Sequence, residues 1–357
     1  MQVNMTDFTQ QTKANQDLFI GIDVHLRNWK VCIRTSSIEV NVFSCEPEPI
    51  ILHKFLQRNF ANYDYYSVYE AGFCGFWIHH EFIRLGINNI IVNAADVATT
   101  NKEKTNKSDV VDCKKLAREL ENKNLSAIFV PSECEIQFRS FFRYRQQVAK
   151  DLRKSMIRIT AFLYTRGKHF EGPNWTVAFI KWMKSDHDFL PIEKSTLMSL
   201  INDYEYHKKK SRQVLRDAKN YILSDEHYKS IYQRLRKIPG IGPVCAVAFI
   251  CEINNMKRFK NENQFASYVG LVPSVRSSDQ TEHVLGVQRR AKKILRSLLI
   301  QATWMAIRKD SALLEYYGES VKRMKPQKAI IKVAKKLLNR IRYVWLNDKD
   351  YVYGLIK

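Results

Sequence analysis

The segment Leu18–His25 constrains the fold most strongly, because it places a single carboxylate at the end of an apolar run of strand length. Apolar residues with β-branching, bounded by turn signals, are typical of a buried strand. Asp23 ends this run, and burying its charge is costly unless it is paired or binds a cation. For Asp23 taken alone, a residue that caps the following turn is an equally good interpretation.

Strands and helices alternate from Leu18 to about Val130. The pattern predicts strands at 18–23, 29–35, 39–44, 65–70, 89–93 and 127–130, and helices at 50–59, 75–86 and 109–122. Residues 1–17 are polar and are expected to form a loose tail. Three early strands, followed by alternating helices and strands, favour an α/β domain with a mixed sheet over residues 18–130.

Long amphipathic helices dominate the rest of the chain. Apolar spacings of three and four predict helices at 135–166, 195–223 and 225–237, with a break at 167–173 and an insert at 174–191. The two longest would form an antiparallel coiled-coil arm in a domain at 131–230, which more often mediates assembly than catalysis. Further helices are predicted at 243–253, 261–269, 287–309 and 326–346, in a mostly α-helical C-terminal domain at 231–346.

The charge balance indicates a polyanionic partner. Lys and Arg number 58 against 36 Asp and Glu, a formal net charge of +22, which favours nucleic acid first and an anionic membrane second. The helix at 326–346 is strongly basic on one side, where it either lies along phosphates or is merely solvated. Its basic residues include Lys328, Lys332, Lys335, Lys336 and Arg340.

The seven cysteines and the hydropathy pattern bear on the compartment. The cysteines form no CxxC pair and no zinc-ligand spacing, so free thiols in a reducing cytosol are expected. No signal peptide is visible, and no apolar run approaches the roughly 20 residues that a membrane span needs.

Three further acids follow Asp23 at positions that suit a metal site. Glu70 ends the predicted strand at 65–70, and Asp109 and Asp112 lie one helical turn apart behind Ser108, a good helix N-cap. Acids in a first helical turn also suit the helix dipole, which is the alternative for this pair. Together the four carboxylates would meet at one edge of the sheet, where they repel one another unless a divalent cation binds them. Two Mg²⁺ ions about 4 Å apart serve phosphoryl transfer in this way.

The order Asp, Glu, Asp-x-x-Asp on such a domain resembles the RNase H-like fold of Holliday-junction resolvases of the RuvC type. The sequences Gly-Ile-Asp-Val, Tyr-Glu-Ala-Gly and Lys-Ser-Asp-Val-Val-Asp-Cys resemble more closely the Piv-type DEDD transposases of the insertion-sequence family numbered one-ten. This resemblance implies that Asp23, Glu70, Asp109 and Asp112 hold Mg²⁺, one or two ions per site, with Mn²⁺ as a substitute.

A second set of motifs supports the resemblance. The sequence Ile238-Pro239-Gly240-Ile241-Gly242-Pro243 resembles a helix-hairpin-helix turn, in which Gly240 and Gly242 let the backbone approach a phosphate. A tight turn between packed helices is the alternative. The sequence Phe-Ala-x-x-x-Gly-Leu-x-Pro at 265–273 precedes a polar, serine-rich loop at 274–279. In the family a serine at this point attacks DNA, which implies Ser278 as nucleophile and Ser277 as the fallback. Asp279 and Ala291 stand where the family commonly has Gly.

The resemblance implies an insertion-sequence transposase that cuts and rejoins DNA through a covalent phosphoserine intermediate. It further implies a structured guide RNA that bridges target and donor DNA, and a homodimer or homotetramer in which the serine of one subunit completes the metal site of another. The expected location is the bacterial cytoplasm, at the nucleoid, without a membrane. Two alternatives remain open: a metal-dependent junction nuclease of the RuvC type that uses water, and a non-catalytic nucleic-acid-binding relative.

Overall fold

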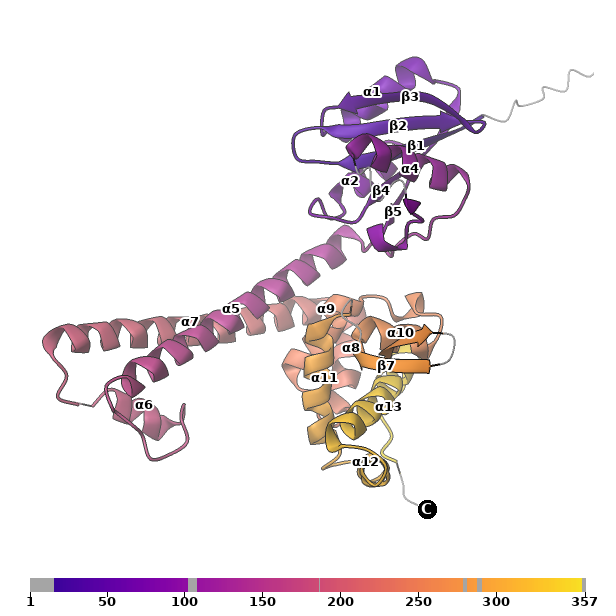
Figure 1. Ribbon diagram of the computed structural model, residues 1–357. Coiled ribbons are helices and arrows are strands. Elements are labelled where there is room, and N and C mark those ends of the chain that lie inside the picture. Colours follow the sequence, from indigo (N-terminus) through magenta and orange to yellow (C-terminus); the bar gives the residue numbers. More distant parts are fainter. Residues whose placement is uncertain (1–15, 102–107, 186, 279–280, 288–290, 355–357) are drawn as a thin grey trace, which may run out of the picture. The chain divides into compact units, whose positions relative to one another are not determined.

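The computed structural model describes residues 16–101, 108–185, 187–278, 281–287 and 291–354 (Figure 1). The predicted tail at 1–17 therefore lies almost entirely outside the described residues. Contacts divide the chain into two compact units, Met1–Pro131 and Ser132–Lys357, called here the N-terminal and C-terminal units. The predicted arm, apart from Pro131, and the predicted C-terminal domain both fall within the C-terminal unit.

The N-terminal unit is built on a five-stranded mixed sheet with the strand order β3-β2-β1-β4-β5. Strand β1 pairs antiparallel with β2 and parallel with β4, which in turn pairs parallel with β5. The predicted α/β domain with a mixed sheet is confirmed. The strands are β1 (Gln16–Val24), β2 (Trp29–Thr35), β3 (Ile38–Cys45), β4 (Tyr63–Glu70) and β5 (Asn88–Val92). The helical segments are α1 (Pro49–Asn59), α2 (Trp77–Arg84), η1 (Ala94–Asp96) and α4 (Asp109–Glu121).

Helices cover both faces of this sheet. Successive side chains of a strand point to opposite faces, so each face has residues that pack against a helix. Ile20 and Ile22 are fully buried in one cluster with residues of α1 and α2. On the other face Val68 packs with Leu116 of α4. Strand β1 therefore lies in the middle of a three-layer core.

Gly21 determines how closely α4 approaches β1. A Cβ atom at this position would lie 2.2 Å from the carbonyl oxygen of Cys113 and 2.4 Å from the backbone nitrogen of Ala117. Both atoms belong to the α4 backbone, which cannot move aside as a flexible side chain could. The absence of a side chain at residue 21 therefore allows the helix to pack directly on the strand.

The prediction of a strand at 127–130 is wrong. This segment contributes only an isolated antiparallel bridge between Val92 and Ala127. Ile128 and Val130 are partly buried against the core of the sheet, so their apolar pattern reflects packing and not a paired strand.

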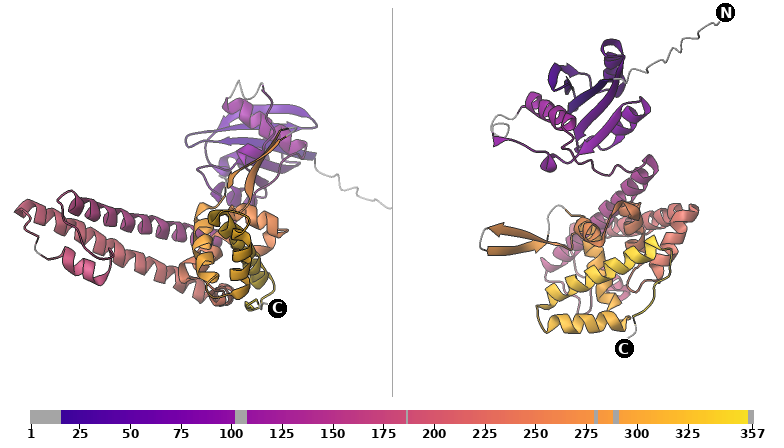
Figure 2. Two further views of the ribbon diagram at one scale, coloured as in Figure 1. Left: turned by 60° about the horizontal axis from the view of Figure 1, so that its bottom comes forward. Right: turned by 90° about the vertical axis from the view of Figure 1, so that its right-hand side faces the viewer.

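Two long helices, α5 (Glu133–Tyr164) and α7 (Pro191–Ser224), lie side by side in the C-terminal unit (Figures 1 and 2). The short helix α6 (Val177–Met183) lies within the insert at 174–191, whose role the sequence does not indicate. Phe179 and Met183 of α6 share a buried cluster with Ile159 of α5 and Ile201 of α7. The predicted antiparallel helix pair is thus present, and α6 completes its core.

The remaining helices share one core, in which α9 (Pro243–Ile253) packs against α11 (Lys293–Ala306) and is buried from Cys245 to Ile253. Gly240, in the turn before α9, has a φ of +81° and lies so close to α11 that a Cβ would be 2.0 Å from the carbonyl oxygen of Ala302. The turn is therefore tightly packed against another helix. The elements are α8 (Glu226–Lys237), α9 (Pro243–Ile253), η2 (Met256–Arg258), α10 (Glu262–Val269), α11 (Lys293–Ala306), α12 (Ser311–Val321) and α13 (Pro326–Leu346).

An antiparallel hairpin stands where a polar loop was expected. Strands β6 (Pro273–Ser278) and β7 (Thr281–Val287) pair with each other and project from the helices of the C-terminal unit (Figure 2). The helix predicted to begin at residue 287 begins at Lys293. Val275, Thr281, Val284 and Val287 are β-branched and favour strands, a signal hidden by the neighbouring serines. Helix α12 was not predicted at all.

The described residues agree with two simpler expectations. All seven cysteines are free thiols, as predicted. Burial raises the pKa of Cys113, Cys245 and Cys251 to about 12, so these thiols stay protonated at neutral pH. None of the helices in the described ranges combines the length and apolar character needed to cross a bilayer.

Candidate active site

Asp23 and Glu70 lie next to each other at the ends of two parallel strands. The register pairs Ile22 with Tyr69, so the residues that follow them occupy neighbouring positions on β1 and β4. Ile22 and Tyr69 are both fully buried with α1 and α2. Since side chains alternate along a strand, Asp23 and Glu70 face the opposite side, where α4 packs.

Asp109 and Asp112 lie in the first turn of α4. The Ser108 hydroxyl accepts a hydrogen bond of 3.3 Å from the backbone N–H of Val111, which confirms the predicted N-cap. Because Gly21 lets α4 pack directly on β1, the first turn of the helix comes to the end of the strand that carries Asp23. The sheet and one helix thereby gather acids from four separate positions of the sequence.

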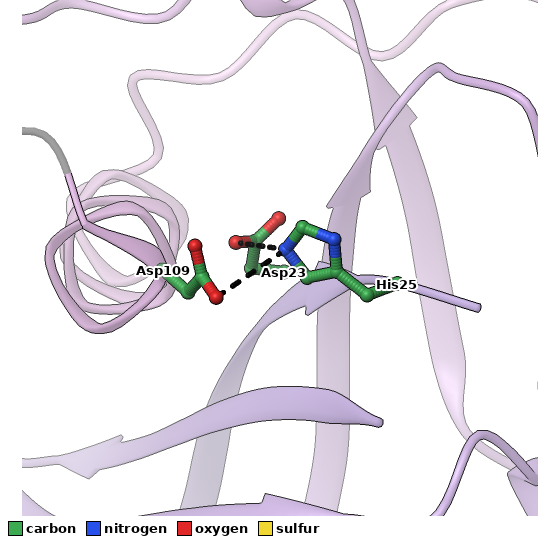
Figure 3. Close-up of side chains that lie close together, drawn as sticks. All are labelled: Asp23, His25 and Asp109. Atoms are coloured by element: carbon green, nitrogen blue, oxygen red, sulfur yellow. Dashed lines mark hydrogen bonds and ion pairs between the residues drawn. The ribbon is translucent and has the colours of Figure 1, made fainter. Parts of the chain in front are cut away.

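Asp23, His25 and Asp109 form the tightest group in this region (Figure 3). His25 Nε2 lies 3.1 Å from Asp23 Oδ2 and 3.6 Å from Asp109 Oδ2. One potential ligand atom from each of the three residues lies within 4.8 Å of the others. Such a spacing allows all three to bind one ion after small side-chain adjustments.

The environment of Asp23 is unfavourable for an isolated negative charge. Burial raises the pKa of Asp23 above its ordinary value, and the charges of Asp109 and Asp112 raise it further. His25 opposes this rise through its charge and its hydrogen bond to the same carboxylate. A cation at this position would relieve the repulsion among the three acids.

Lys115 occupies the space between the other two acids. Its ammonium lies 2.9 Å from Asp112 Oδ1 and 3.5 Å from Glu70 Oε1. Burial works to lower the pKa of Lys115, but Asp112 and Glu70 outweigh it and the net change is a rise. Lys115 is therefore a buried, charged ammonium that forms ion pairs with both Glu70 and Asp112.

Sequence reasoning therefore identified the four acids but missed two residues that contact them. His25 lies two positions after Asp23, and residues two apart in an extended segment point to the same side. The sequence therefore contained a signal that His25 lies near Asp23. Lys115 lies three positions after Asp112, which puts the two on one face of α4. Lysine is so common on helix surfaces that its burial could not be inferred.

Ser277 and Ser278 lie in the hairpin of the C-terminal unit. Ser277 pairs with Glu282, and Ser278 pairs with Thr281. Ser278 is the last residue of β6. Asp279, at which the sequence departs from the family pattern, lies outside the described residues.

Gly240 and Gly242 flank the turn between α8 and α9. Gly242 is the N-cap of α9 and Pro243 occupies its first turn, while a Cβ at Gly242 would meet no atom within 4 Å. Gly240 is required by packing against α11, whereas Gly242 leaves open space at the helix N-terminus. The structure thus supports the packing interpretation for Gly240 and is compatible with phosphate approach at Gly242.

The basic residues of α13 differ in their availability. Lys328, Lys332 and Lys336 are exposed. Lys335 donates a hydrogen bond of 3.1 Å to Asn263 Oδ1. Arg340 donates a hydrogen bond of 2.8 Å to the fully buried carboxylate of Asp310, so its guanidinium already serves an internal contact.

Comparisons with known proteins address the C-terminal unit most directly. Residues 232–318 match the family model described as "Transposase IS116/IS110/IS902 family". The matched segment contains Gly240, Gly242, Ser277 and Ser278.

Similarity to individual proteins extends further along the chain. A Sinorhizobium fredii protein named "Putative transposase y4qE" is 24% identical over 296 residues, which cover 81% of this chain and 72% of that protein. The transposase for insertion sequence element IS1533 of Leptospira borgpetersenii is 24% identical, over 68% of this chain and 72% of its own length. The transposase for insertion sequence element IS1111A of Coxiella burnetii is 33% identical over 76 residues, 21% of each chain. The chain is thus similar to transposases of the IS116/IS110/IS902 family in its matched segment, and to individual transposases over most of its length.

Proposed function

We propose that this protein is a DNA transposase that cuts and rejoins strands through Ser278, with divalent cations held by Asp23, Glu70, Asp109 and Asp112. One observation carries the proposal: a single sheet edge gathers the four acids, in a chain whose C-terminal segment matches a transposase family. The helix dipole favours Asp109 and Asp112 and Lys115 pairs with Glu70 and Asp112, but neither contact compensates the repulsion of Asp23 by Asp109 and Asp112.

The donor set fits a divalent cation. Asp23 and Asp109 offer carboxylate oxygens, the ligands that Mg²⁺ prefers, and His25 adds an imidazole nitrogen, which transition ions such as Mn²⁺ accept more readily. Burial raises the pKa of Asp23, and repulsion from Asp109 and Asp112 adds to the rise; a bound cation would oppose both effects. When bound, the ion would neutralise charge on the scissile phosphate and favour ionisation of the attacking hydroxyl.

Each protein residue then has a definite task. The Ser278 hydroxyl oxygen forms a bond to phosphorus while the bond from phosphorus to a sugar oxygen breaks, and the serine proton passes overall to that leaving oxygen. The resulting phosphoserine conserves the energy of the phosphodiester, so that a second strand can be joined by the reverse reaction. Lys115 holds Glu70 and Asp112 in position through its two ion pairs.

The partners follow from the family resemblance and the charge. Element ends and target DNA are the proposed substrates, in keeping with the net charge of +22. A structured guide RNA and assembly as a homodimer or homotetramer belong to the same proposal. The helix pair α5 and α7 is the candidate for the assembly contact, because Ile157 and Tyr164 on α5 are more than half exposed.

A covalent protein–DNA adduct on a denaturing gel tests the proposal. Purified protein would be incubated with Mg²⁺, DNA carrying the element end, and RNA transcribed from its flanking region. We expect an adduct with the wild type and none with Ser278→Ala or with Asp23→Asn, which keeps the shape of Asp23 but removes its charge. Ser274→Ala, in the same strand, is the matched control and should retain the adduct.

The outcomes separate the alternatives. Loss of the adduct in Ser277→Ala but not in Ser278→Ala would move the nucleophile by one residue. Cleavage that needs Mg²⁺ and Asp23, without an adduct and without Ser278, would identify a metal-dependent nuclease that uses water. Salt-sensitive DNA binding without any Mg²⁺-dependent product would identify a non-catalytic relative.

A further inference from the structure

The buried carboxylate of Glu252, near the C-terminal end of α9, faces cationic side chains from separate elements of the C-terminal unit. Glu252 is 2% exposed. Its carboxylate oxygens lie 3.2 Å from Arg143 Nε, 3.5 Å from Lys292 Nζ and 3.8 Å from Arg139 Nε. The backbone oxygen of Glu252 also accepts hydrogen bonds from Arg139, at 3.4 Å, and from Arg258, at 3.5 Å. These five residues are called here the Glu252 cluster.

The Glu252 cluster holds more positive than negative charge. Among the side chains that the structure describes there, three cations, Arg139, Arg143 and Lys292, meet one carboxylate. Burial lowers the pKa of Lys292, and the charges of Arg143 and Arg139 lower it further against the opposing effect of Glu252. Burial likewise lowers the pKa of Arg139. The charges of Arg143 and Arg258 lower it further, against the opposing effects of Tyr268 and Glu252. The cations therefore repel one another in a partly desolvated site, and an anion would stabilise them.

The cluster is closed on one side and open on the other. The side chains of Glu252 and Arg139 are 3% and 10% exposed, whereas those of Lys292 and Arg143 are 34% and 53% exposed. Arg139 Nε is buried without a hydrogen-bond partner in the described part of the chain. A ligand can thus reach the two outer cations while Glu252 and Arg139 support them from within.

The cluster also lies at the base of the β6–β7 hairpin. Tyr268 precedes the hairpin and Lys292 follows it, and the Lys292 backbone N–H donates a hydrogen bond of 3.1 Å to the Tyr268 carbonyl. The Tyr268 hydroxyl donates a hydrogen bond of 2.9 Å to the backbone oxygen of Glu252. The hairpin that carries Ser278 is therefore anchored at Lys292, one of the cations of the Glu252 cluster, and at Tyr268, which contacts Glu252.

We propose that the Glu252 cluster binds a backbone phosphate of nucleic acid, with Arg143 and Lys292 as its ligands and Glu252 as the group that orients them. The inference rests on the proposed function, since it assigns the substrate a contact at the base of the serine hairpin. The cations outnumber the one carboxylate that they contact, and Arg143 is half exposed, so the cluster has charge and donors available to a ligand. Guanidinium and ammonium groups with donors left over are suited to phosphate oxygens.

The salt dependence of binding tests the contact directly. Affinity for a duplex DNA and for an RNA hairpin of equal charge would be measured at several salt concentrations, for wild type, Arg143→Gln and Arg143→Lys. Each phosphate contact adds about one unit to the slope of log affinity against log salt concentration. We expect Arg143→Gln to lower this slope by about one unit for the nucleic acid that occupies the site, irrespective of its sequence. Arg143→Lys should retain the slope.

Arg158→Gln is the matched control, because Arg158 is exposed on the same helix, about 22 Å further along at 1.5 Å per residue. It should leave the slope unchanged. An equal decrease in both variants would overturn the proposal, because it would show a general effect of net charge. Normal nucleic-acid binding with an unchanged slope in Arg143→Gln would overturn the inference but leave the proposed function standing. Absence of nucleic-acid binding by the wild type would overturn both.

Glu252→Gln should change the affinity for phosphate in the opposite direction to Arg143→Gln. Glu252→Gln removes the carboxylate charge but keeps an amide oxygen that can still accept hydrogen bonds from Arg143 and Lys292. The cations stay oriented but lose their compensating charge, so we expect tighter phosphate binding together with a lower thermal stability. Weaker binding by a folded Glu252→Gln protein would contradict the proposal. Circular dichroism would verify the fold, and Arg143→Gln remains a test if this variant does not fold.

Discussion

His25 changes the chemistry expected at the acid cluster, because its Nε2 atom lies within 4 Å of carboxylates from two different elements. If His25 is a ligand, Mn²⁺ bound to the full chain should show ¹⁴N coupling from a coordinated imidazole in pulsed electron paramagnetic resonance. His25→Ala should abolish this coupling and weaken Mn²⁺ binding by about tenfold, while Mg²⁺, which seldom takes nitrogen ligands, should be affected less.

The control for this measurement is His53→Ala, since His53 belongs to the same unit but lies on α1. It should keep both the coupling and the affinity. Mn²⁺ that binds wild type and His25→Ala alike, without nitrogen coupling, would restrict the site to the four acids. His25 would then act only as a hydrogen-bond partner of Asp23.

Some residues of the site were predictable and others were not, for physical reasons. Asp23 and Glu70 could be found because a charge at the end of an apolar strand conflicts with the local pattern. Asp109 and Asp112 could be found because Ser108 marks a helix start. The ion pairs of Lys115 depend on how deeply α4 packs against the sheet, and the ion pair between Arg340 and Asp310 joins residues 30 positions apart. No local pattern encodes either contact.

The contact between β1 and α4 is the structural element on which the acid cluster depends. Gly21→Ala would place a Cβ 2.2 Å from the carbonyl oxygen of Cys113, so α4 must shift away from the strand. We expect a loss of about 1–3 kcal/mol in the free energy of unfolding, as for other overpacked core positions, and weaker Mn²⁺ binding because Asp109 moves from Asp23. Urea denaturation and a Mn²⁺ titration would measure the two effects.

Gly72→Ala is a suitable control for Gly21→Ala, because its added Cβ would come no closer than 3.9 Å to another atom. Its free energy of unfolding should stay within about 0.5 kcal/mol of wild type. A Gly21→Ala protein as stable as Gly72→Ala would show that α4 does not pack on the backbone of β1 in solution.

Elements were predictable from sequence where one periodicity dominated. The bounds of β2, α9 and α13 agree with the prediction, because each has a clear apolar pattern and a turn or proline at its start. The β6–β7 hairpin was missed because its serines are typical of loops, and pairing between β6 and β7 outweighs that preference. Helix α12 was missed although Asp310 accepts a hydrogen bond from the Leu313 backbone N–H as its N-cap, a signal that the sequence did contain.

The whole molecule combines two units with separate cores and separate candidate chemistry. The buried apolar clusters around β1 contain only residues of the N-terminal unit, and those around α9 contain only residues of the C-terminal unit. All four acids, together with His25 and Lys115, belong to the first unit, and both candidate serines belong to the second. Among the described residues, the ion pairs and hydrogen bonds of the acid cluster all lie within Met1–Pro131.

This division predicts that residues 1–131 fold alone and keep the cation site. A domain of this size buries roughly two thirds of the surface of its unfolded chain, which is sufficient for independent stability. The fragment should unfold cooperatively in urea and bind Mn²⁺ with an affinity within about threefold of the full chain, whereas the fragment carrying Asp23→Asn should bind it more weakly. A fragment that unfolds without a cooperative transition would show that the core around β1 requires the C-terminal unit. A folded fragment without Mn²⁺ binding would show that the cation site requires a group from outside Met1–Pro131.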